Sequence, residues 1–97
     1  MSELIYINIR MEARPGMREI LRQRMLEAVP NVVALGGTSV VTVDEKDDHV
    51  FYLHEIMPNQ AAIDADMASP IVKAFLADMA DFTTHGTNFQ TVKSFPA

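Results

Sequence analysis

The stretch ELIYINIRMEA, residues 3–13, alternates between two kinds of side chain. One side of an extended chain carries the apolar residues Ile5, Ile7, Ile9 and Met11. The other side carries Tyr6, Asn8, Arg10 and Glu12. A period of two with β-branched residues predicts a β-strand, and the Pro15-Gly16 pair that follows is a turn signal.

The period changes after Gly16, and apolar residues then recur every three or four positions. These residues are Met17, Leu21, Met25 and Ala28. This spacing predicts an amphipathic helix over residues 17–29. We expect Pro30 to end it, because a proline disfavours the α conformation of the residue before it.

The rest of the chain contains signals for three strands and two further helical segments. TSVVTV (38–43) and HVFYLHEIM (49–57) predict a hairpin joined by the acidic turn 44–48. Asn59 predicts the start of a helix over 60–67, and Ser69-Pro70 predicts the start of another. The expected apolar stripe of that helix comprises Ile71, Phe75, Leu76, Met79 and Phe82. Residues 88–95 predict a last strand.

The resulting order, β-α-β-β-α-β, is that of a ferredoxin-like α+β fold. We expect a single domain over residues 1–97, with a four-stranded antiparallel sheet and the two helical regions on one face. The other face of such a sheet has no cover within one chain. We therefore expect a homodimer that forms through the open sheet face.

Composition excludes several classes of partner and site. The 97 residues have a formal net charge of −5, from 8 basic and 13 acidic residues, which disfavours nucleic-acid binding. Cysteine is absent, so neither disulfides nor thiolate metal sites can form. No apolar run approaches the roughly 20 residues that span a bilayer. We expect a cytoplasmic protein that does not interact with membranes.

Four polar residues are candidates for chemistry. Glu55 shares a strand face with apolar residues, so burial should raise its pKa and suit it as a general base, unless it pairs with Arg10. Asn8 is mid-strand and could donate to a substrate oxygen or simply bond to its neighbours. Asp66 is either a base or, with Asp64, part of a solvated helix face. His85, in the break before the last strand, could line a cavity mouth.

The sequence contains no pattern that holds a metal or a nucleotide cofactor. His54 and Glu55 are adjacent on a strand and point to opposite faces, so they cannot chelate one ion together. Gly36-Gly37 is a dipeptide and lacks the spacing of a phosphate-binding loop. We therefore expect no cofactor and no metal.

Three segments together resemble one known family. They are RPGMRE (14–19), FYLHEIM (51–57) and QAAIDADMASP (60–70) followed by Phe75. In this order and spacing they are similar to the antibiotic biosynthesis monooxygenase domain, a dimeric α+β barrel. The resemblance covers nearly the whole chain and implies a cavity between the sheet and the helices of each subunit.

The resemblance also implies which positions line that cavity. In oxygenase and haem-degrading members these are an Asn on the first strand, a Trp ending the third and a His on the second helical segment. The corresponding residues here are Asn8, Met57 and Asp66. The His is the iron ligand of the haem-degrading members, so its replacement argues against haem degradation.

The resemblance implies a cofactor-independent monooxygenase that acts on an aromatic phenol or quinol-type small molecule. Asn8 would orient the substrate, and Glu55, Asp66 or His85 would help to remove its proton. Two alternatives stay open. The chain could be a non-catalytic dimer that binds a small aromatic ligand, or a non-oxidative isomerase of the autoinducer-degrading type, which would need basic residues to hold a phosphate.

Overall fold

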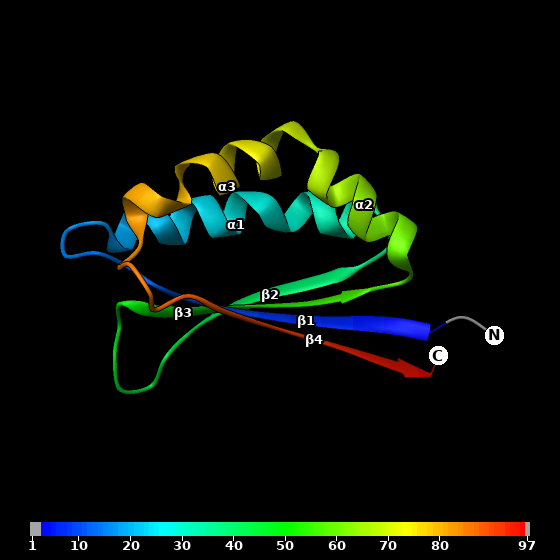
Figure 1. The fold of residues 1–97 in the computed structure, drawn as a ribbon, viewed down its shortest axis with the longest axis horizontal. Helices are drawn as coiled ribbons and strands as arrows, with labels where there is room; N and C mark the ends of the chain where they lie inside the picture. The colour runs from blue at the N-terminus through cyan, green and yellow to red at the C-terminus, as the bar shows by residue number, and fades with distance from the viewer. Residues whose placement is uncertain (1–2, 97) are drawn as a thin grey trace.

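The protein, described here over residues 3–96 by a computed structural model, has two layers. The helices all lie over one face of a single sheet, and the other face is bare (Figure 1). The elements in chain order are β1 (Glu3–Glu12), α1 (Arg18–Ala34), β2 (Thr38–Val43), β3 (Val50–Met57), α2 (Gln60–Ala68), α3 (Pro70–Phe82) and β4 (Phe89–Pro96). This arrangement confirms the predicted ferredoxin-like α+β fold.

The sheet is antiparallel throughout, with strand order β2-β3-β1-β4. Ile7 on β1 lies opposite Glu55 on β3, and Asn8 lies opposite His54. Residues directly opposite each other share a face of the sheet. Ile7 and Glu55 therefore face the helices, and Asn8 and His54 face the bare side.

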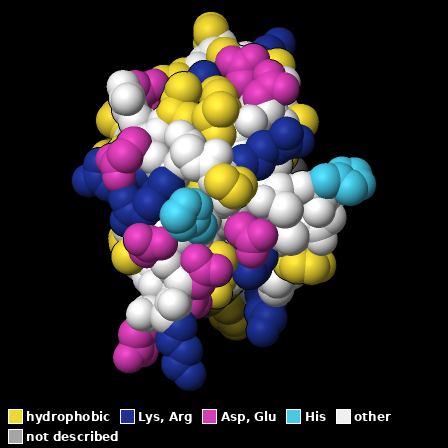
Figure 2. Space-filling model, turned by 90° about the vertical axis from the view of Figure 1, so that its left-hand side faces the viewer, with side chains coloured by type: hydrophobic (Ala, Val, Ile, Leu, Met, Phe, Trp, Pro, Cys, Tyr) yellow, Lys and Arg dark blue, Asp and Glu magenta, His cyan; other side chains and the backbone are white. Residues whose placement is uncertain are grey.

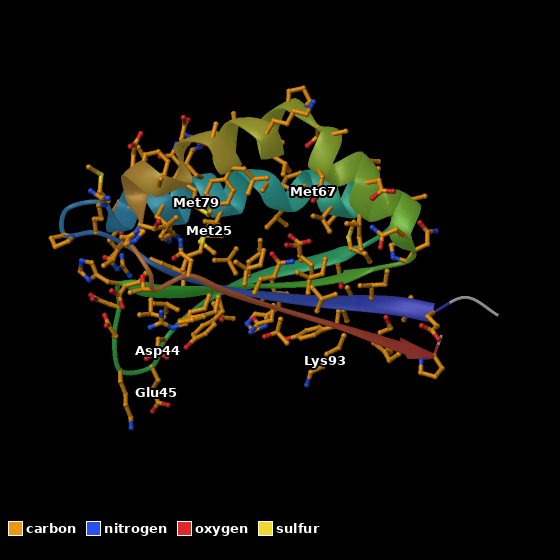
Figure 3. The ribbon with its side chains drawn as sticks, in the orientation of Figure 1. Met25, Asp44, Glu45, Met67, Met79 and Lys93 are labelled. Carbon is orange, nitrogen blue, oxygen red and sulfur yellow. The ribbon has the colours of Figure 1, made fainter. Side chains whose placement is uncertain are left out.

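The core fills the space between the inner face of the sheet and the helices. Its fully buried side chains include Met11, Leu21, Met25, Val32 and Met57. Two clusters share this layer, one around Met11 and Phe51 and the other around Ile7 and Met57. Met25 and Met79 lie on the helix side of the sheet, whereas Lys93 projects from the opposite side (Figure 3).

The prediction that Pro30 ends the first helix is wrong, because α1 continues to Ala34. Pro30 is exposed on the helix, and the turn after it carries Val32, which is buried beneath α1 in the cluster with Ile7. Packing of this last turn outweighs the roughly 3 kcal/mol that a proline costs inside a helix. The helix ends instead at Ala34, and Gly36 then turns the chain with a φ of 87° that most residues avoid.

Gly37 brings β2 close to the end of β3. A Cβ at this position would lie 2.7 Å from Met57 Sδ and 2.8 Å from the Ile56 carbonyl oxygen. Val32 Cγ1 would be 2.9 Å away. Only glycine therefore fits between the end of α1 and Met57.

The second helical region is two helices that meet at Ser69. Ser69 ends α2 and caps α3, where its Oγ accepts a hydrogen bond from the Val72 N–H. The predicted caps at Asn59 and Ser69 are confirmed. The predicted apolar stripe of α3 is partly wrong: Ile71 and Leu76 are 37% and 42% exposed, and Val72 is buried in their place.

The arginines of the first quarter are dispersed among carboxylates. Arg10 pairs with Glu12, Arg24 with Asp78, and Arg18 with Glu19 and Asp48. Acidic and basic side chains also alternate across the end of the molecule shown in Figure 2. These contacts agree with charges that decorate solvent-facing surfaces.

Across residues 3–96, no helix is both long enough and apolar enough to cross a membrane.

Candidate active site

An apolar cavity of about 140 Å³ lies between the inner face of the sheet and the helices α2 and α3. Ile9 and Met57 from the sheet and Met67 and Phe75 from the helices form part of its wall. Figure 3 shows Met67 on α2, on the helix side of the sheet. An apolar cavity of roughly 150 Å³ in another protein holds a benzene molecule, so this one has room for a single six-membered ring.

Glu55 places a carboxyl group in this apolar wall. It lies on β3 between the buried residues Leu53 and Met57, and it is only 7% exposed. Burial, followed by the nearby charge of Asp66, raises the pKa of Glu55 to about 7. The alternative pairing with Arg10 is wrong, because Arg10 lies on the outer face and bonds to Glu12 and the Thr87 carbonyl.

Asp66 places a second carboxyl group in the same cavity, from the opposite wall. It lies on α2 and is also 7% exposed. The expectation that it decorates a solvated helix face is therefore wrong, although Asp64 on the same helix is exposed. Asn31 Nδ2 on α1 donates a hydrogen bond of 2.6 Å to Asp66 Oδ1 and lies 3.2 Å from Ser69 Oγ.

Asn8 does not join these carboxyl groups. Its side chain lies on the outer face of the sheet, opposite His54 and Thr91, and does not line the cavity. The physical reason is the alternation of β1, since Ile7 and Ile9 take the inner positions on either side of it. Its Oδ1 is buried and has no hydrogen-bond partner within the described part of the chain.

His85 does not join them either. It is exposed and lines a separate hollow with Arg14, Thr84 and Asn88. That hollow is at the end of α3, and none of its polar residues lines the cavity of Glu55 and Asp66. The structure thus brings together two of the four candidate residues.

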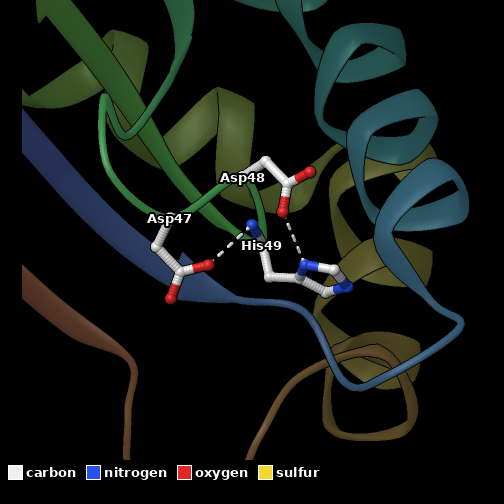
Figure 4. A group of neighbouring side chains, drawn as sticks. All are labelled: Asp47, Asp48 and His49. Carbon is white, nitrogen blue, oxygen red and sulfur yellow. Dashed lines mark hydrogen bonds and ion pairs between the residues drawn. The ribbon is translucent and has the colours of Figure 1, made fainter.

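The turn between β2 and β3 contains a compact group of polar side chains, Asp47, Asp48 and His49 (Figure 4). One oxygen atom of each aspartate and one ring nitrogen of His49 lie within 4.8 Å of one another. Each already has a local partner: Asp47 accepts from the His49 backbone N–H, and Asp48 Oδ1 is 2.9 Å from His49 Nδ1. These contacts hold the turn, and the two aspartates are exposed on the surface whereas His49 is partly buried.

Asn31 is a part of the site that the sequence did not reveal. Its position directly after Pro30 suggested the end of a helix, whereas it lies within α1 and reaches across to α2. The available signal was that Asn31 is a polar residue close to the buried positions Ala28 and Val32. A buried polar side chain normally has a hydrogen-bond partner, so a partner on another element could have been expected.

Comparisons with known proteins match this chain through its structure. No family model matches the sequence, and no curated protein matches it significantly. A protein from Shewanella oneidensis has a TM-score of 0.86 at 13% identity, with 97% of this chain and 92% of that chain covered.

Two further solved structures have descriptions that indicate an activity. One is described as an antibiotic biosynthesis monooxygenase, with a TM-score of 0.76, 19% identity and coverage of 96% of this chain and 97% of that chain. The other is a candidate antibiotic biosynthesis monooxygenase from Caulobacter crescentus, with a TM-score of 0.81, 17% identity and coverage of 95% and 89%. The protein therefore has the fold of the antibiotic biosynthesis monooxygenase proteins, as the resemblance in its sequence implied.

Proposed function

We propose that this protein is a cofactor-independent monooxygenase whose substrate is a single-ring phenol or quinol-type molecule. The observation that carries the proposal is the carboxyl group of Glu55, whose pKa of about 7 suits a general base, in an apolar cavity with room for one ring. The shared fold with proteins described as antibiotic biosynthesis monooxygenases supports the reaction type.

The proposed reaction starts with Glu55 as the base. Ionised Glu55 takes the hydroxyl proton of the phenol, and the electron-rich phenolate passes one electron to O₂. The two radicals combine at a ring carbon, and Glu55 protonates the resulting peroxide. Glu55 then takes the proton on that carbon as the O–O bond breaks, and it returns this proton to the departing hydroxide.

The reaction balances without an external reductant. One oxygen atom of O₂ becomes the new carbonyl oxygen, and the other leaves as water. The phenol supplies all the electrons, because its O–H and C–H bonds are lost as the quinone forms. We assign the proton transfers to Glu55 and substrate binding to Asp66, and we assign no part in the reaction to Asn8 or His85.

Oxygen uptake tests this proposal. Purified protein treated with a chelator is supplied with single-ring phenols and quinols, and uptake is compared with the rate of autoxidation. We expect Glu55→Gln to lower uptake at least 100-fold, because general bases contribute about 10²–10⁴-fold. Glu45→Gln, an exposed residue in the β2–β3 turn, is the matched control. Equal uptake by wild type and Glu55→Gln would refute the role of Glu55.

We also propose that two copies pair through the outer face of the sheet. This face has no helix over it, and it exposes apolar side chains of Val40, Ile56 and Phe89. Sedimentation of the wild-type protein at micromolar concentration should give the dimer mass. Val40→Lys should shift it toward the monomer, whereas Val33→Lys on α1 should not. A cytoplasmic location stays a prediction from the sequence.

The alternative of a non-catalytic, ligand-binding dimer has one observation in its favour, which is the presence of Met57 where the resemblance implies a Trp. Ring binding without uptake of oxygen across the panel would select this alternative. The isomerase alternative is disfavoured, because no Lys, Arg or His among the described residues lines the cavity to hold a phosphate.

A further inference from the structure

The cavity holds more negative charge than one general base requires. Glu55 and Asp66 enter it from opposite walls, from β3 and from α2. Gln90 on β4 is the third polar residue of the lining, and the remaining lining residues among positions 3–96 are apolar. The lining thus contains two carboxyl groups and no Lys, Arg or His side chain.

Two buried carboxylates without a cation are an unfavourable arrangement. In an apolar environment each charge loses hydration, and each repels the other. Asn31 donates a hydrogen bond to Asp66, but its neutral amide brings no positive charge to that carboxyl group. The side chain of Glu55 has neither a hydrogen bond nor an ion pair with any residue from 3 to 96. A positively charged group in the cavity would relieve both penalties.

The walls limit what can carry that positive charge. Met57, Met67 and Phe75 form an apolar surface that suits a flat ring. The volume of about 140 Å³ fits one ring with a short substituent. The carboxyl groups lie beside this surface, so a cation attached closely to the ring can reach them.

We propose that the cavity binds a single-ring molecule with a primary ammonium group on a short side chain, and that Asp66 is the residue that pairs with this group. Asp66 selects such cations and excludes carboxylates and phosphates of the same shape. The inference rests on the proposed function for the location of the site, and it names the ligand class. In this arrangement Glu55 remains free to act on a hydroxyl of the same ring.

A matched set of three small probes tests the selection. Benzylamine is a cation, benzyl alcohol is neutral and benzoate is an anion, and all three carry one ring with one short substituent. Titration calorimetry at pH 7.5 on the intact protein gives their dissociation constants. We expect benzylamine to bind at least tenfold more tightly than benzyl alcohol, because a charge-assisted hydrogen bond is about twice as strong as a neutral one. Benzoate should bind at least tenfold more weakly than benzyl alcohol.

Two variants separate Asp66 from general electrostatics. Asp66→Asn keeps the shape and should weaken benzylamine at least tenfold while benzyl alcohol changes less than about twofold. Asp64→Asn removes the same charge from the exposed side of α2 and should leave all three constants unchanged. Circular dichroism spectra of both variants establish that the fold is intact.

Proton release gives a second readout. Because burial and Asp66 raise the pKa of Glu55, a bound ammonium group should lower that pKa again and expel a proton at pH 6.5. Calorimetry in two buffers with different ionisation enthalpies measures this proton, and Glu55→Gln should abolish its release. Proton release that persists in Glu55→Gln would overturn the proposal that the ammonium group binds beside Glu55 and Asp66.

The outcomes distinguish this inference from the proposed function. Benzoate binding as tightly as benzylamine, equal binding of benzylamine by wild type and Asp66→Asn, or no binding of any probe would overturn the ligand class. Oxygen uptake that depends on Glu55 could still stand after that result. Conversely, the cation preference could hold while oxygen uptake fails, which would leave a binding protein for ring amines.

Discussion

Replacing Glu55 by Gln should stabilise the folded protein, and the gain should grow with pH. In the folded state the pKa of Glu55 is raised from 4.5 to about 7. The stability associated with its protonated form is fully present below pH 4.5 and is lost as the pH rises through 7. Gln cannot ionise, so the variant does not suffer this loss.

The size of the effect follows from the two pKa values of 4.5 and about 7. Each pH unit between them costs about 1.4 kcal/mol of unfolding free energy. Most of this interval lies between pH 5 and pH 8, so the advantage of Glu55→Gln should be about 2.5 kcal/mol larger at pH 8 than at pH 5. Comparing the two pH values cancels any constant difference between a Gln and a protonated Glu.

Urea unfolding followed by circular dichroism measures this difference. Both proteins are unfolded at pH 5 and pH 8 at one fixed concentration, because association also contributes to stability. Glu45→Gln is the control: this residue is exposed, so its replacement should give the same change in unfolding free energy at both pH values. An advantage of Glu55→Gln that is the same at both pH values would refute the argument that burial holds the proton on Glu55.

Three further changes test the elements around the cavity. Gly37→Ala should lower the unfolding free energy by about 1–3 kcal/mol through overpacking against Met57, measured by urea unfolding. Gly86→Ala is the control: a Cβ there has open space around it, so the variant should lose only about 1 kcal/mol, for its φ of 79°. Asn31→Ala should cost about 1–3 kcal/mol in urea unfolding, because it leaves a buried carboxylate without its donor, and an unchanged unfolding free energy would contradict this reason. Ser69→Ala should lower the melting temperature through the loss of a cap worth about 1 kcal/mol, and an unchanged melting temperature would show that the cap is unimportant.

Local signals were sufficient for the fold. The alternation of residues 3–13 and 49–57 assigned the inner and outer faces of β1 and β3, and the structure has the same assignment. Caps at Asn59 and Ser69 marked the true starts of α2 and α3. Pro30 misled because its local preference is weaker than the burial of Val32, which depends on residues far away in the sequence.

The site was only half predictable. Glu55 stood out because an acidic residue occupied an inward position of a strand, and alternation alone decides that position. The same alternation places Asn8 on the outer face of the sheet. The resemblance had implied that Asn8 lines the cavity, and the structure does not show this. The resemblance indicated Asp66 as a cavity position, whereas its contact with Asn31 required knowledge of how α1 and α2 are oriented against each other, which no local pattern contains.

The position of Glu55 within the sheet has a mechanical consequence. β3 is hydrogen-bonded on both sides, to β2 and to β1, so its backbone cannot shift to bring this carboxyl group into water. A buried carboxyl group on a flexible loop could instead reach water by movement of the loop. Held on an inner strand, Glu55 can respond only by exchanging a proton or by accepting a partner from outside. The paired strand thus keeps the carboxyl group of Glu55 in the cavity, where it can exchange protons with a bound molecule.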